Sequence, residues 1–174
     1  IFLLTENNQK VIKQEVITNL YNFPEEKDWA IEDTRLFYWK NKIMINHSLV
    51  IKGKINGLIN QTSVLSALSV LDGKKNTITF KAIPKVDFRT QNFEKNWVYK
   101  ERNDDLFLFY SINPFRVLKL VDEKEMVFES EINKNISSFN DPGGFGTMVS
   151  FSVNPIDLDA KYWLLIIHQI KNKI

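Results

Sequence analysis

Apolar and polar residues alternate along most of the chain with a period close to two, the pattern of half-buried β-strands. The predicted strands are Arg35–Trp39, Ile43–His47, Thr77–Ile83, Leu106–Tyr110, Thr147–Val153 and Tyr162–His168. One segment, Gln9–Leu20, is long enough for a helix, but its four β-branched residues favour a strand. The pattern therefore predicts an all-β chain.

Short polar segments separate these strands and predict hairpin connections. They are Lys40–Lys42, Asp72–Lys74, Arg102–Asp105 and Asn154–Asp159. Pro84, Pro114 and Pro155 fall at predicted strand ends, where the missing N–H donor costs least.

Three segments of the chain follow one plan: a polar or glycine-rich motif, a strand, a hairpin and an apolar strand that ends in a polar residue. They start at Glu32, Glu94 and Gly143, which are 62 and 49 residues apart, and their end residues are His47, Ser111 and His168. This spacing is close to the roughly 40–50 residues of a β-propeller blade. We therefore expect a β-propeller in which equivalent polar groups line a central channel that suits a small polar ligand.

Composition narrows the function classes. The 174 residues include no cysteine, which excludes disulfides, thiolate metal sites and cysteine nucleophiles and fits a reducing, cytoplasmic location. Only two histidines are present, so a metal site with several histidines would have to recruit carboxylates, and we predict no metal site. The 23 basic and 21 acidic residues nearly balance, so no nucleic-acid partner is expected. No apolar run reaches the roughly 18 residues of a membrane span.

The first motif, Glu32–Arg35, places two carboxylates next to a cation, and Trp29 precedes it. Side chains alternate across a strand, so Arg35 should share the face of Asp33 and not that of Glu32. An acid beside a cation suits proton transfer or anion binding, and a nearby Trp suits stacking on a sugar ring. The alternative is a surface ion pair worth less than about 1 kcal/mol.

The second and third motifs also offer polar groups. In the second, Glu94 and Asn96 should share one face and could hold vicinal hydroxyls, with Lys95 and Trp97 beside them; alternatively, Trp97 packs between blades. The third, Asp141–Gly146, includes Gly144 and offers backbone N–H groups, but it fits neither the dinucleotide fingerprint nor the P-loop, and a wide turn is the alternative.

In this order, the motifs resemble those of the five-bladed β-propeller carbohydrate-active enzymes, in the group of the β-mannoside phosphorylases and β-mannosyltransferase-like proteins. Glu32–Arg35 matches the Glu-Asp-Pro-Arg motif of that group, with Thr34 in place of proline. Glu94–Trp97, with the strand that ends in Tyr110–Pro114, matches a second motif of its relatives.

A third match is Gly143–Val149 with the strand that ends at His168. The resemblance implies that Asp33 is the general acid of a glycosyl-transferring enzyme without a cofactor, and that cations hold phosphate for direct attack on the sugar. The candidate cations are Arg35, Lys95, Arg116 and His168. That group tends to carry Arg directly after the strand that here ends at Ile112, and Arg116 lies further along.

Three functions follow as alternatives: β-mannoside phosphorolysis or hydrolysis, transfer from a nucleotide-sugar or sugar-phosphate, and carbohydrate binding without catalysis. The substrate partner is a small carbohydrate in each case. Three blade motifs against the five of that group predict that residues 1–174 form one partial propeller domain, which another chain or segment completes.

Overall fold

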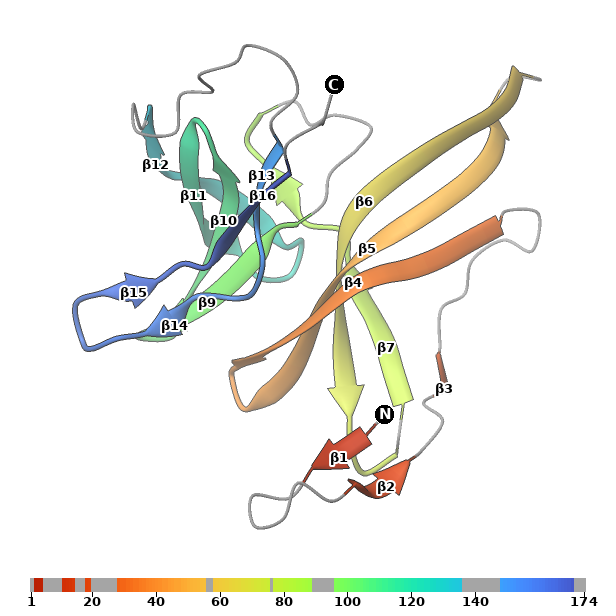
Figure 1. The fold of residues 1–174 in the computed structure, drawn as a ribbon, viewed down its shortest axis with the longest axis horizontal. Coiled ribbons are helices and arrows are strands. Elements are labelled where there is room, and N and C mark those ends of the chain that lie inside the picture. The colour runs from red at the N-terminus through yellow and green to blue at the C-terminus, as the bar shows by residue number, and fades with distance from the viewer. Residues whose placement is uncertain are drawn as a thin grey trace.

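The computed structural model describes residues 2–4, 11–14, 18–19, 28–55, 58–75, 77–88, 96–135 and 148–170. These residues form strands and turns, with no helix among them (Figure 1), so the prediction of an all-β class is confirmed. The described parts of Gln9–Leu20 are strands as well, and the three prolines fall at strand ends as expected. Apart from the larger sheets, β1 (Phe2–Leu4) pairs with β2 (Val11–Gln14).

The first sheet has five strands in the order β3-β7-β6-β5-β4. Its strands are β3 (Thr18–Asn19), β4 (Asp28–Trp39), β5 (Lys42–Ile55), β6 (Leu58–Asp72) and β7 (Thr77–Ala82). The last four form an antiparallel meander, and the short β3 pairs in parallel with β7.

The second sheet repeats this topology in the order β8-β12-β11-β10-β9. Its strands are β8 (Lys85–Val86), β9 (Val98–Arg102), β10 (Asp105–Ile112), β11 (Phe115–Asp122) and β12 (Val127–Lys134). Again four strands form an antiparallel meander, and the short first strand pairs in parallel with the last.

A third unit consists of two strand pairs, β13–β16 and β14–β15. Its strands are β13 (Met148–Phe151), β14 (Ile156–Asp157), β15 (Trp163–Leu164) and β16 (Ile167–Ile170). The prediction of a hairpin at Asn154–Asp159 is wrong in position, because the chain reverses after β14. There the carboxylate of Asp159 accepts bonds from the N–H groups of Lys161 and Tyr162 at 2.7 and 2.8 Å, a local bond that favours a turn.

The hairpins that begin the two meanders have the same geometry. Lys40 and Asn41 between β4 and β5, and Asn103 and Asp104 between β9 and β10, all have positive φ. This is the signature of a type I′ turn, which matches the twist of the paired strands. Superposing the two turns aligns each residue of β4 with the residue 63 positions later, and the strand registers agree with this alignment.

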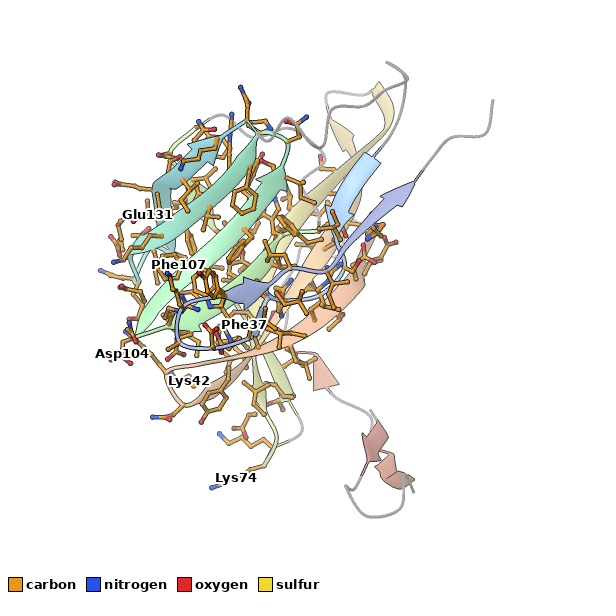
Figure 2. The ribbon with its side chains drawn as sticks, turned by 60° about the vertical axis from the view of Figure 1, so that its left-hand side comes forward. Phe37, Lys42, Lys74, Asp104, Phe107 and Glu131 are labelled. Atoms are coloured by element: carbon orange, nitrogen blue, oxygen red, sulfur yellow. The ribbon has the colours of Figure 1, made fainter. Side chains whose placement is uncertain are left out.

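Two apolar layers hold the units together. Met44, Leu68, Tyr99 and Leu108 are among the fully buried residues between the first and second sheets, where the rings of Phe37 and Tyr99 stack 5.2 Å apart. A second layer joins the far face of the second sheet to the third unit. Figure 2 labels Phe37 and Phe107, which belong to these two layers.

The outward faces of this arrangement carry exposed apolar side chains. Leu36, Tyr38 and Ile43 lie on the first sheet, and Leu164 and Ile166 lie on the third unit. The described residues leave these side chains exposed and cover neither outward face with a further apolar layer. The described sheets therefore do not close into a ring.

Candidate functional site

The first strands of the two meanders, β4 and β9, and the first strand of the third unit, β13, approach one another near Arg35. Arg35 lies on β4, Asn96 lies two residues before β9, and Phe151 and Ser152 lie at the end of β13. We use the name Arg35 cluster for Asp33, Arg35, Asn96, Ser152 and His168. Four of them are predicted site residues: Asp33 and Arg35 from the first motif, Asn96 from the second, and His168 from the strand that follows the third.

A β-bulge shapes the β4 side of the cluster. Glu32 pairs with Ser48 and Arg35 with Asn46, so two residues, Asp33 and Thr34, lie opposite one residue of β5. The prediction that Arg35 shares the face of Asp33 assumed strict alternation and is wrong, because the extra residue shifts the alternation by one. Glu32 and Arg35 therefore share a side of the sheet, and Glu32 is exposed.

Asp33 is the first residue of this bulge and has a φ of 53°. This left-handed conformation is uncommon outside glycine, although Asp and Asn adopt it more readily than other residues. The side chain of Asp33 is exposed. Asn96, the residue aligned with Asp33 in the second sheet, has a φ of 63°. The two sheets therefore place the same uncommon backbone conformation seven positions before their type I′ hairpins, within β4 in the first sheet and two residues before β9 in the second.

Arg35 connects all three units through its guanidinium group. Its Nε donates to the carbonyl of Ser152 at 3.0 Å, and one terminal nitrogen donates to the carbonyl of Asp33 at 3.2 Å. The other terminal nitrogen donates to Oδ1 of Asn96 at 3.2 Å and to the carbonyl of Phe151 at 3.3 Å. Partial burial lowers the pKa of Arg35, and the nearby charge of Asp33 opposes this shift.

These contacts engage four of the five N–H groups of a guanidinium. Arg35 therefore has little capacity left for a bidentate bond to phosphate. Its geometry instead fixes the bulge, the entry to β9 and the end of β13 relative to one another.

His168 lies next to this arrangement on the third unit. Its Nδ1 is 3.0 Å from Oγ of Ser152, whose own carbonyl accepts from Arg35. His168 is exposed. With Nδ1 engaged by a hydroxyl, Nε2 is the ring nitrogen that remains for a ligand.

Asn154, which the sequence pattern predicts to lie in a turn, makes hydrogen bonds to both the first and the second sheet. Its Nδ2 donates to the carbonyl of Leu36 on β4 at 2.9 Å. Its Oδ1 accepts from the N–H of Tyr99 on β9, also at 2.9 Å. Asn154 therefore bridges the edges of two sheets, and the Asn-Pro pair that suggests a turn carries no signal of this long-range role.

Three predicted site residues lie away from the cluster. Trp97 is 3% exposed and belongs to the core between the two sheets, in line with the alternative expectation that it packs between blades. His47 is buried on the side of the first sheet opposite Asn46, with Nε2 3.1 Å from Oγ of Ser69. Arg116 lies over the ring of Phe88 at 4.7 Å, and no described residue joins it to Arg35.

The remaining predicted site residues fall outside the described part of the chain. Glu94, Lys95 and Gly144 lie there, as does the side chain of Trp29.

Ser111, the end residue of the second repeat, donates its hydroxyl to the carbonyl of Pro114 at 2.6 Å. The repeat alignment from the hairpins pairs Ser111 with Ser48, and His47 with Tyr110.

Comparison with protein-family models, curated proteins and solved structures finds no match for this chain. Within the described ranges, no three His, Asp or Glu side chains are arranged to hold a metal ion. The same ranges contain no helix that is long and apolar enough to cross a membrane.

Proposed function

We propose that the chain is part of a β-propeller that binds a carbohydrate and transfers a glycosyl group, with Asp33 as the proton donor. Two five-stranded sheets of the same topology support successive blades. The first strands of these units lie together, which is where the blades of a propeller surround their central channel.

The observation that carries the proposal is the way Arg35 holds Asp33. Arg35 bonds to the carbonyl of Asp33 while Asp33 occupies a left-handed backbone conformation. Backbone strain of this kind persists where the surrounding contacts over-determine it, and it is concentrated at functional sites. The side chain of Asp33 is exposed here, and Arg35 also bonds to the side chain of Asn96, whose amide can bond to a sugar hydroxyl.

In this mechanism Asp33 donates a proton to the glycosidic oxygen as the bond to the anomeric carbon breaks. Arg35 is a positioning residue, because its donors are committed to the protein. When phosphate is the attacking group, its charge then requires other cations, for which His168 is available within the cluster. In transfer from a nucleotide-sugar or sugar-phosphate, the Asp33 carboxylate accepts the proton of the acceptor hydroxyl as that oxygen bonds to the anomeric carbon and the nucleotide or phosphate leaves.

Binding without turnover is a second candidate function. Asp33 is the only carboxylate in the Arg35 cluster, whereas glycoside hydrolases use a pair. A single carboxylate suffices for sugar binding and for phosphorolysis, but not for the common hydrolytic mechanisms.

The test compares wild-type protein with Asp33→Asn on β-mannosides with and without phosphate, and on mannose 1-phosphate and nucleotide-mannose donors. Asn keeps the left-handed preference, so the fold should persist while turnover falls by at least about 100-fold, the usual contribution of a general acid. Glu129→Gln, which removes an exposed carboxylate of β12 outside the cluster, is the control and should stay active. Unchanged turnover in Asp33→Asn would refute the assignment, and sugar binding without any turnover would favour the second candidate.

A further inference from the structure

A pocket of about 400 Å³ lies on the hairpin side of the Asn154 bridge. Its walls are residues 36–38 of β4 and residues 99–101 of β9, and Asn154 and Pro155 also line it. It falls in the size range of small-molecule sites. We call it the hairpin-end pocket, and none of its lining residues belongs to the Arg35 cluster.

The Asn154 side chain shows what this space between the two strands accommodates. A carboxamide resembles a peptide group, and this one donates to a carbonyl of β4 and accepts from an N–H of β9. An intervening β-strand would make the same two bonds, since it would lie between edges roughly 9.5 Å apart, twice the spacing of neighbouring strands. Asn154 therefore fills one level of an open slot between two strand edges.

The next level of the slot lies in the pocket. Leu36 and Tyr99 are aligned positions, and two residues further along each strand lie Tyr38 and Glu101. Because backbone groups of a strand point to the same edge every second residue, the N–H and C=O groups of Tyr38 and Glu101 also face the slot. In the described part of the chain, no side chain bridges this level in the way that Asn154 bridges the one above.

The two ends of the slot limit what can enter. Asn154 and Pro155 line one end. At the other end, the backbone N–H of Lys40 donates to a carboxylate oxygen of Glu101 at 3.2 Å. A peptide strand cannot run through, so the occupant must be a short group that inserts from the side.

Charge and exposure also define the occupant. Lys100 is paired with Asp157, so the lining has no unpaired cation for an anionic ligand. The carboxylate of Glu101 accepts the backbone N–H of Lys40, and a carboxylate in the lining disfavours an anion. Leu36 and Tyr38 are each 59% exposed and offer apolar surface for the remainder of the ligand. The lining therefore suits a neutral molecule with both hydrogen-bonding and apolar parts.

We propose that the hairpin-end pocket binds a neutral small molecule through a secondary carboxamide, such as an acetamido group. By analogy with Asn154, the amide N–H of the ligand donates to the carbonyl of Tyr38, and its carbonyl accepts from the N–H of Glu101. This site is independent of the proposed function, because it uses neither Asp33 nor any other member of the Arg35 cluster.

The experiment is a titration of the full chain, followed by the backbone amide signals of Tyr38 and Glu101 in nuclear magnetic resonance spectra. N-methylacetamide and N-acetylglucosamine are the probes, and N,N-dimethylacetamide and glucose are their controls. We expect saturable shifts at both residues with the two probes. The dimethyl compound lacks the N–H donor, and it should bind about tenfold more weakly because it leaves the Tyr38 carbonyl unpaired.

Two variants make the result specific to the pocket. Leu36→Trp fills it at an exposed position and should abolish the shifts, whereas Ile43→Trp, on an exposed position outside the lining, should leave them unchanged. The Asp33→Asn variant should bind the probes like the wild type even though it loses turnover. No saturable shift with either probe, equal binding of the dimethyl control, or full binding by Leu36→Trp would overturn the proposal.

Discussion

The first and second sheets share a backbone plan but differ in the chemistry of their first two strands. Both have a short parallel strand, a four-stranded meander, a type I′ hairpin and a left-handed residue seven positions before that hairpin. At aligned positions, however, Arg35 corresponds to Val98 and Asn46 corresponds to Phe109. The same register thus carries two polar groups in one sheet and two buried apolar groups in the other.

This difference follows from what each position faces. Val98 and Phe109 are buried in the apolar layer against the third unit. Arg35 and Asn46 lie where backbone carbonyls need donors: Asn46 donates to the carbonyl of Trp97 at 2.9 Å, and Arg35 donates to three further carbonyls. The comparison teaches that backbone repetition is compatible with polar joints between units. Arg35 and Asn46 make such joints from the first sheet, and Lys100 and Arg102 make others between the second sheet and the third unit.

The largest expected effect comes from removing the central joint. Arg35→Ala loses four hydrogen bonds and leaves partly buried acceptors unpaired, so we expect a loss of about 3 kcal/mol in the free energy of unfolding. Val98→Ala at the aligned position should cost about 2 kcal/mol through lost apolar burial. Urea unfolding measures both. A loss below about 0.5 kcal/mol for Arg35→Ala would contradict its role as a joint.

A smaller effect separates backbone conformation from side-chain contact at the two left-handed positions. Asp33→Ala should cost about 1 kcal/mol, because alanine disfavours positive φ, while Asp33→Gly should stay within about 0.5 kcal/mol of wild type. Asn96→Gly should cost about 1 kcal/mol more than Asp33→Gly, since only Asn96 accepts a side-chain bond from Arg35. Equal stability of the two glycine variants would show that this bond contributes nothing.

The smallest expected effect is a pH dependence that only the first sheet carries. Burial lowers the pKa of His47, and a backbone hydrogen bond involving Ser48 opposes the shift. Because the native pKa lies below the unfolded value of about 6.5, the unfolded state takes up the proton first, and His47 stabilises the fold only above that pH. Its contribution is lost as the pH falls through and below about 6.5.

Urea midpoints at about pH 7.5 and pH 5.5 should therefore fall more in the wild type than in His47→Gln. The slope from one proton cannot exceed about 1.4 kcal/mol per pH unit. A Tyr110→Phe variant, at the aligned position of the second sheet, leaves His47 in place and should keep the wild-type dependence. Identical pH profiles of wild type and His47→Gln would show that His47 makes no contribution.

Strand prediction succeeded most clearly where burial alternates along a strand, as in residues 35–39 of β4 and residues 105–108 of β10. β5 also appears close to its expected position, although its residues 44–50 are all buried. β6 was not predicted, because residues 64–71 are largely buried on both faces and lack alternation. β12 was also not predicted, since most of its side chains are exposed and carry no apolar period.

The amino-acid sequence by itself determined the all-β class and the hairpins at Lys40–Lys42, Asp72–Lys74 and Arg102–Asp105, because alternation and turn chemistry are local properties. It also pointed to Asp33, Arg35, Asn96 and His168, which the fold does bring near one another. Only the tertiary structure decided that Trp97 is core, that a bulge places Glu32 on the side of Arg35, and that Asn154 joins two strand edges. The core position of Trp97 and the bridge by Asn154 depend on contacts between residues more than 50 positions apart, and the bulge depends on how β4 pairs with β5, for which no period in the sequence exists.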